Sequence, residues 1–163
     1  MSIQSIERTK QLALHVGLSA EFIHHQQSGK TTEDAVVALG IDAGSIIKTL
    51  ILHASKEDLF IAAVILGSDR LSCHMLASLA GVKSLRFASP EQIEKLTGFE
   101  LGGVPPLAVK YCNRAFVDSL VVRKDSVVGA GGDDHCGMKF SPEDLLTRLP
   151  ITVANISERS TQV

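Results

Sequence analysis

The segment TGFELGGVPPLA, residues 97–108, places two glycines and two prolines inside an otherwise apolar stretch. An ordinary surface loop needs less, since one glycine with a few serine or asparagine residues is enough. Gly102 and Gly103 leave the backbone free, whereas Pro105 and Pro106 fix φ only two residues later. A chain that is flexible at one end and rigid at the other within five residues indicates more than a connection between two elements.

The composition around this segment is that of an ordinary globular protein, and 163 residues fit one domain with a real core. The longest apolar run, residues 59–67, is too short to span a bilayer, and the N-terminus lacks the apolar core of a signal peptide. Three cysteines without a CxxC pair predict free thiols in a reducing cytoplasm. The net charge of −2 argues against tight, sequence-independent binding to DNA or other long nucleic acid.

The pattern of apolar residues predicts an α/β fold with a mixed sheet, because helices and strands alternate irregularly and include a hairpin. Thr31 and Gly40 bracket one helix as its cap residues, and SPEQIEKL and SPEDLLTRL each begin with a Ser-Pro cap. After Pro150 the apolar pattern is lost, so we expect residues 151–163 to fray. We expect helices within 5–16, 31–40, 68–81, 89–96 and 141–149, and strands within 21–25, 41–53, 56–67, 84–88, 114–121 and 126–132.

The glycine-rich segment GAGGDDH, residues 129–135, is not a phosphate-binding loop. It lacks Gly-Lys-Ser/Thr, Asp134 stands where GxGxxG needs glycine, and two adjacent acids repel a phosphate. We interpret it as a turn that follows a strand.

Metal binding and thiol catalysis also find little support in the sequence. Cys73-His74 and His135-Cys136 are adjacent pairs, whereas a zinc site favours i, i+3 or i+4 spacing or CxxC. Cys136 as a nucleophile beside His135 is equally unsupported. On a strand, His24 and His25 would point to opposite faces and would not form a catalytic pair. We therefore expect no metal and no other cofactor.

Lys48 lies between Ile46-Ile47 and the apolar strand TLILH, where a strand enters the interior. Two interpretations stay open on this evidence. The lysine can extend its amino group to solvent from a strand end, or it can be a cation fixed beside a cleft to meet an anionic ligand.

Three longer stretches resemble the YbaK-type aminoacyl-tRNA deacylases, the free-standing relatives of the editing domain inserted in bacterial prolyl-tRNA synthetases. The likeness runs from about residue 31 to 149, in the family's order and spacing. Gly102-x-x-x-Pro106 matches the family's GxxxP loop, and Lys48-Thr49-Leu50 stands in the place of its functional lysine. The stretches are TTEDAVVALGIDAGSIIKTLIL (31–52), ASPEQIEKLTGFELGGVPPLA (88–108) and VVGAGGDDHCGMKFSPEDLL (127–146).

The resemblance implies one domain over residues 1–150, with a curved mixed β-sheet flanked by helices and a small pocket. It implies hydrolysis of the ester that joins a mischarged amino acid to the 3′-terminal adenosine of tRNA. The substrate's own 2′-hydroxyl would help to activate or position the water, so that no Ser-His-Asp triad is needed.

The resemblance also assigns roles to residues. Lys48 would contact the phosphate or ribose of the CCA end. Gly102 and Gly103 would let the backbone approach the substrate, and preorganised amides of this loop would polarise the ester carbonyl. The substrate-binding positions that it implies are Thr49, Val104, Pro105 and Pro106.

The third stretch departs from the family. Where some members carry a serine and an aspartate at the pocket, this chain has Ala130 and Gly137. The synthetase-embedded relatives have an aspartate and a histidine nearby, which makes His135 a candidate for the amino-acid pocket. Two functions follow: a trans-acting deacylase, most simply for tRNA(Pro), or a non-catalytic module that binds tRNA or a synthetase. Lys48 with an intact Gly102–Pro106 loop favours the deacylase.

Overall fold

A computed structural model describes residues 3–158 of the chain. Its largest sheet has five strands in the order β5-β2-β3-β6-β9. β2 pairs antiparallel with β3 and β5, whereas β3–β6 and β6–β9 are parallel, so the sheet is mixed. The strands are β2 (Ile47–Ala54), β3 (Leu59–Leu66), β5 (Arg86–Phe87), β6 (Arg114–Asp118) and β9 (Thr152–Ala154).

Two smaller sheets complete the strands. The antiparallel sheet β1-β8-β7 meets the large sheet through a bridge between Ile46 and Val128, and β4 pairs with β10. The predicted mixed α/β fold is confirmed, with its strands divided among three sheets. These strands are β1 (Ala20–His24), β4 (Arg70–Leu71), β7 (Val127–Ala130), β8 (Cys136–Phe140) and β10 (Ser157–Glu158).

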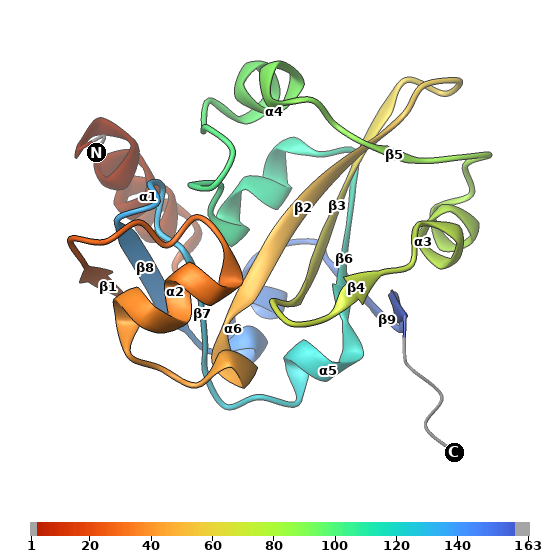
Figure 1. The fold of residues 1–163 in the computed structure, drawn as a ribbon. Helices are drawn as coiled ribbons and strands as arrows, with labels where there is room; N and C mark the ends of the chain where they lie inside the picture. The colour runs from red at the N-terminus through yellow and green to blue at the C-terminus, as the bar shows by residue number, and fades with distance from the viewer. Residues whose placement is uncertain (1–2, 159–163) are drawn as a thin grey trace.

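The helices surround the β2–β3 hairpin, which runs through the middle of the molecule with α3 on one side and the β1-β8-β7 sheet on the other (Figure 1). None of the helices within residues 3–158 combines the length and the apolar character that a bilayer crossing requires. They are α1 (Ile3–Val16), α2 (Thr32–Leu39), α3 (Cys73–Ala80), α4 (Pro90–Thr97), α5 (Ser119–Val122) and α6 (Pro142–Arg148), with 3₁₀ turns η1 (Ala43–Ser45) and η2 (Pro106–Tyr111).

The predicted caps at Thr31 and Ser89 form side-chain hydrogen bonds, whereas the one predicted at Ser141 does not. The Thr31 hydroxyl accepts a hydrogen bond from the Asp34 amide, and Gly40 ends α2 in the left-handed conformation. Ser89 and Gln92 form a reciprocal capping box at α4. Ser141 occupies the N-cap position of α6 but makes no side-chain capping bond.

β3 is central because both of its faces are covered. One face packs in a core beneath α3, and the other packs against the β1-β8-β7 sheet with α1, α5 and α6. A strand buried on both faces reads as a continuous apolar run, which explains the sequence of residues 59–66. Alternate residues divide between the two cores, Ile61, Ala63 and Ile65 in the first and Ala62, Val64 and Leu66 in the second.

Three predictions for the C-terminal half need correction. The strand expected over 114–121 ends at Asp118, where α5 begins. Residues 131–135 form the expected turn, but β8 follows them as a strand that the sequence analysis did not predict. Residues 151–163 were expected to fray, yet β9 and β10 lie within them; residues 159–163 are outside the described part.

Asp118 explains both the strand end and the ordered segment after Pro150. Its buried carboxylate accepts hydrogen bonds from the backbone amides of Ile156 (2.9 Å) and Ser157 (3.2 Å), and it also caps α5 through the Leu120 amide. Buried carboxylates require such partners. The segment therefore belongs to the core.

We expect Ile156→Ala to lower the free energy of unfolding by about 2–5 kcal/mol, because Ile156 is fully buried against the α3 core. Urea denaturation measures the change. Val153→Ala, at a side chain 45% exposed in the same segment, is the control and should change it by about 0.5 kcal/mol or less. Equal, small effects of the two substitutions would show that the segment does not contribute to the core.

Candidate active site

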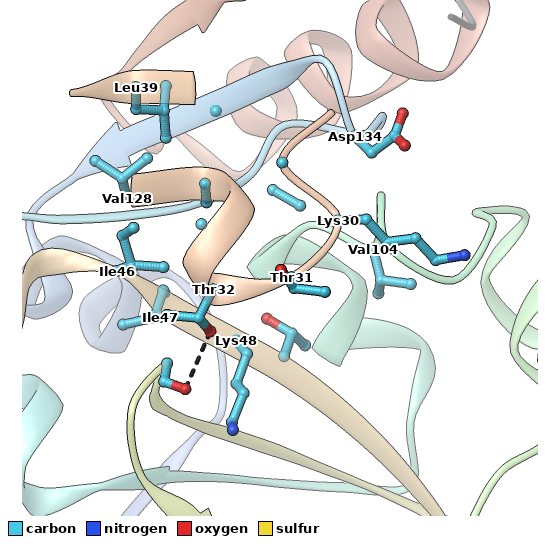
Figure 2. A pocket seen from close by; sticks show the side chains of 18 of the residues that line it. Lys30, Thr31, Thr32, Leu39, Ile46, Ile47, Lys48, Val104, Val128 and Asp134 are labelled. Atoms are coloured by element: carbon cyan, nitrogen blue, oxygen red, sulfur yellow. Dashed lines mark hydrogen bonds between the residues drawn. The ribbon is translucent and has the colours of Figure 1, made fainter. Parts of the chain in front are cut away.

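A cavity of about 390 Å³ opens between four segments of the chain: 29–35 with α2, 46–50 at the start of β2, 101–104 before η2, and 128–137 in the β7–β8 hairpin. Figure 2 shows the side chains that line it. Of the residues predicted from the sequence, the structure brings six into the lining: Lys48, Thr49, Gly102, Val104, Ala130 and Gly137.

Lys48 is the second residue of β2 and is partly buried in the pocket wall. Burial lowers the pKa of its ammonium below the ordinary lysine value of 10.5, and the carboxylates of Asp69 and Glu33 oppose this shift. The protein therefore acts on the Lys48 ammonium in two opposite ways, since burial disfavours its charge and the two acids stabilise it. Of the two interpretations of Lys48, the cation beside a cleft is the one that this position favours.

The first turn of α2 is fastened to the end of β3 by Thr32, a residue that the sequence analysis did not single out. Its hydroxyl donates to the Gly67 carbonyl over 3.0 Å, and the Gly67 amide donates to the Ile46 carbonyl over 2.7 Å (Figure 2). A Cβ at Gly67 would lie 2.6 Å from the Thr32 hydroxyl oxygen, so glycine is needed there. The bonds fix one wall of the pocket.

Only part of the Gly102–Pro106 loop faces the cavity. Gly102 lines it and has a φ of 96°, which favours glycine, and Val104 lines it beside Gly102. Gly103, Pro105 and Pro106 are buried and are absent from the lining. The Pro106 ring occupies the space that a Cβ on Gly129 would need, 2.8 Å from Cγ.

Gly103 lies where the loop meets the β7–β8 turn. A Cβ on this residue would lie 2.9 Å from both the Asp133 Cα and the Gly132 carbonyl oxygen, so Gly103 allows two backbones to touch. Its amide donates to the Glu100 carbonyl over 3.0 Å and is thus engaged within the loop. Gly103 therefore packs two loops together, and its contact with the substrate stays a prediction.

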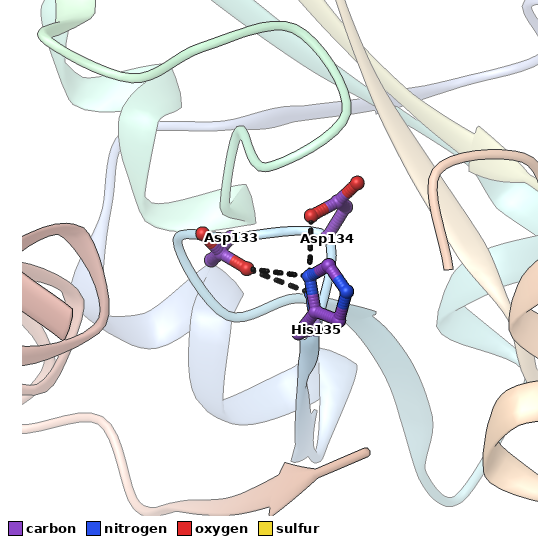
Figure 3. A group of neighbouring side chains, drawn as sticks. All are labelled: Asp133, Asp134 and His135. Atoms are coloured by element: carbon purple, nitrogen blue, oxygen red, sulfur yellow. Dashed lines mark hydrogen bonds and ion pairs between the residues drawn. The ribbon is translucent and has the colours of Figure 1, made fainter. Parts of the chain in front are cut away.

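His135 lies beside the pocket and not in its lining. Its Nδ1 contacts the carboxylates of Asp133 (3.2 Å) and Asp134 (2.8 Å), as Figure 3 shows. Its ring stacks at 6.3 Å on His25, and His25, Asp133 and Asp134 do line the cavity. Thus the histidine that reaches the pocket comes from the segment after β1.

The pocket has an apolar end and a charged end. Leu39, Ile46 and Val128 gather at one side in Figure 2, while Lys30, Asp134 and Lys48 lie away from them. Gly137 belongs to the apolar end, because a Cβ there would lie 3.0 Å from Val128 Cγ1 and 3.3 Å from Leu39 Cδ2. The arrangement suits a ligand that carries an apolar group beside polar, anionic parts.

A thiol and an acidic cluster also lie at the pocket. Cys136 lines the pocket but is buried, and burial raises the pKa of its thiol to about 11, so it is protonated at neutral pH and a poor nucleophile. Within residues 3–158, one group has the spacing to hold a metal ion: ligand atoms of Asp133, Asp134 and His135 lie within 4.8 Å of one another. These side chains already bond to one another, as described above.

The fold and its pocket define a small α/β ligand-binding domain. Residues 26–147 match the sequence model of the family described as "Aminoacyl-tRNA editing domain". The chain belongs to this family, which confirms the resemblance found in the sequence.

Relatives with assigned names include a proline–tRNA ligase of Nitratidesulfovibrio vulgaris (strain DP4), 35% identical over 89 residues. That match covers 55% of this chain but 15% of the ligase, so the chain corresponds to a small part of that enzyme. A protein of Enterococcus faecalis with the provisional name Cys-tRNA(Pro)/Cys-tRNA(Cys) deacylase EbsC is 26% identical over 117 residues, 72% of this chain and 71% of that one.

Among solved structures, a protein described as a candidate trans-editing enzyme for prolyl-tRNA synthetase superimposes with a TM-score of 0.85. It is 28% identical and the superposition covers 98% of this chain and 100% of that one. The likeness extends to the full fold.

We expect Gly103→Ala to lower the free energy of unfolding by about 1–3 kcal/mol, because its methyl group meets backbone atoms that cannot move aside alone. Gly44→Ala is the control, since a Cβ there meets only the ends of the Asp42 and Lys124 side chains. Denaturation midpoints of the two variants measure the difference. If Gly103→Ala is as stable as Gly44→Ala, the two loops are not in backbone contact.

Proposed function

We propose that the protein is a trans-acting aminoacyl-tRNA deacylase, which hydrolyses the ester of a mischarged amino acid on a tRNA of the tRNA(Pro) type. The main observation behind this proposal is that Lys48, Gly102 and Val104 line the same pocket of an editing-domain fold. The names of the relatives support it, since they refer to proline–tRNA ligase and to deacylation of Cys-tRNA(Pro).

The pocket has the chemical parts that ester hydrolysis at a tRNA 3′ end requires. Lys48 is a point charge for the anionic or hydroxylated part of the terminal nucleotide. The backbone of Gly102 and Val104 borders the same space and orients the aminoacyl ester. The substrate's 2′-hydroxyl positions the attacking water, and the small apolar end around Gly137 and Val128 accepts the amino-acid side chain.

The second candidate is a non-catalytic module that binds tRNA or an aminoacyl-tRNA synthetase in the cytoplasm. The partly buried Lys48 favours the enzyme. Removing an ammonium from water costs free energy, and a module that only binds RNA could use exposed lysines without this cost.

The direct test is single-turnover deacylation of a panel of mischarged tRNAs, including Ala-, Ser- and Cys-tRNA(Pro), by the full chain. The deacylase hydrolyses at least one of them well above the uncatalysed rate and spares Pro-tRNA(Pro). Binding of these tRNAs without hydrolysis of any would favour the module instead.

Lys48→Met should reduce single-turnover deacylation by about 10²-fold, because it keeps most of the stem but removes the charge that positions the reacting end. The fold should be retained, since Lys48 is partly exposed. Lys95→Met, at an exposed position of α4, is the control and should leave the rate unchanged. A Lys48→Met enzyme with the wild-type rate and midpoint would remove Lys48 from the mechanism.

The rate should fall on the alkaline side at a pH below the ordinary lysine value of 10.5. Burial lowers the pKa of Lys48, so rising pH removes its proton, and the positive charge, earlier than for an exposed lysine. Rates corrected for uncatalysed ester hydrolysis measure this limb. In Lys48→Arg, which stays charged, the limb should disappear; an unchanged limb in that variant would assign it to another group.

A further inference from the structure

A second cation, Lys30, lines the pocket from the segment that precedes α2. In Figure 2 the amino groups of Lys30 and Lys48 point in different directions. Among residues 3–158 no carboxylate forms an ion pair with Lys30, whereas Asp69 and Glu33 act on Lys48. The Lys48 charge is therefore partly buried and stabilised by two acids, whereas the Lys30 side chain is exposed and forms no ion pair with the described residues.

The backbone that carries Lys30 is held in place by Asp134. The Gly29 amide donates to the Asp134 carbonyl over 2.6 Å, and the Ser28 hydroxyl donates to its carboxylate over 2.8 Å. The Lys30 amide in turn donates to the Ser28 hydroxyl oxygen over 3.3 Å. Two bonds thus connect this segment to the β7–β8 turn, and the third holds Lys30 within the segment.

The side chain of Lys30 lies across Gly102. A Cβ on Gly102 would lie 2.8 Å from Lys30 Cγ and 3.3 Å from Cδ, so the stem occupies the space that a larger residue would need. Packing of the stem restricts its rotamers while the ammonium stays exposed to solvent. Gly102, the left-handed glycine of the GxxxP loop, therefore also leaves room for the Lys30 stem to pack against its backbone.

We propose that Lys30 binds a phosphodiester group of the RNA 3′ end, while Lys48 serves the terminal aminoacyl-ribose. The inference rests on the proposed function. An aminoacylated 3′ end brings an ester and ribose into the pocket and leaves its phosphodiesters at the rim, where the exposed ammonium of Lys30 stands. Asp133 and Asp134 line the same pocket and would repel a phosphate placed directly beside them, so the exposed ammonium of Lys30 is the favourable contact.

The test compares two substrates in Lys30→Met and wild type: an aminoacylated RNA minihelix ending in CCA, and the 3′-aminoacyl ester of adenosine, which has no phosphate. At low salt Lys30→Met should raise KM for the minihelix by about 3–10-fold and leave kcat unchanged, the effect of one exposed charge contact. The adenosine ester should be hydrolysed equally by both enzymes. Lys30→Arg should restore the minihelix KM.

Equilibrium binding of the uncharged minihelix gives a readout that does not depend on hydrolysis. The slope of log affinity against log salt should become shallower by about 0.7 in Lys30→Met and stay unchanged in the control Lys95→Met. An unchanged slope and KM, or an equal loss on the adenosine ester, would overturn the assignment of Lys30 to phosphate. A wild type that hydrolyses neither ester contradicts the deacylase itself, and the salt slope still decides on Lys30.

Discussion

The pocket depends on a contact between two backbones, at Gly103 and at Gly132–Asp133. There is no room between them for a single methyl group, since a Cβ on Gly103 would approach the Asp133 Cα to 2.9 Å. The contact places the loop before η2 against the β7–β8 turn and so sets the distance between two walls. Gly129 beneath Pro106 makes a similar contact nearby. Gly103 and Pro106 of this loop thus bring it close to the β7–β8 hairpin, at positions where the facing chain leaves no room for an added side chain.

The charged side chains of the pocket lie away from its apolar side chains. The partly buried ammonium of Lys48 lies at one side, with its charge opposed by desolvation and supported by Asp69 and Glu33. The apolar end, which includes Val128, has no charged group with which to hold an ion. A ligand that spans both ends must be apolar at one end and polar or anionic toward the other. An amino acid esterified to the end of an RNA meets that description, and the chain belongs to the family described as "Aminoacyl-tRNA editing domain".

The sequence was sufficient for features with local causes. The caps at Thr31 and Ser89, the hairpin strand β3 and the position of Lys48 at the start of β2 follow from neighbouring residues. It was insufficient where a partner lies far along the chain. β9 and β10 have only three and two residues and exist because Asp118 holds the segment between them, which no local pattern reveals. The loop-to-loop contact of Gly103 was not predicted for the same reason, since its neighbour Asp133 is thirty residues away along the chain.

We propose that the aminoacylated 3′ end of RNA occupies the pocket between Lys48 and the Gly102–Val104 loop. Backbone amide NMR shifts on titration with a non-hydrolysable 3′-aminoacylamino-adenosine test it most directly. If the compound occupies this pocket, the amide signals of four lining residues should shift saturably: Lys48, Gly102, Val104 and Gly137. Signals around the second cavity, of about 230 Å³ and lined by residues within 109–116 and 150–152, should not change. Shifts confined to that second cavity, or no saturable shifts at any concentration, would contradict it.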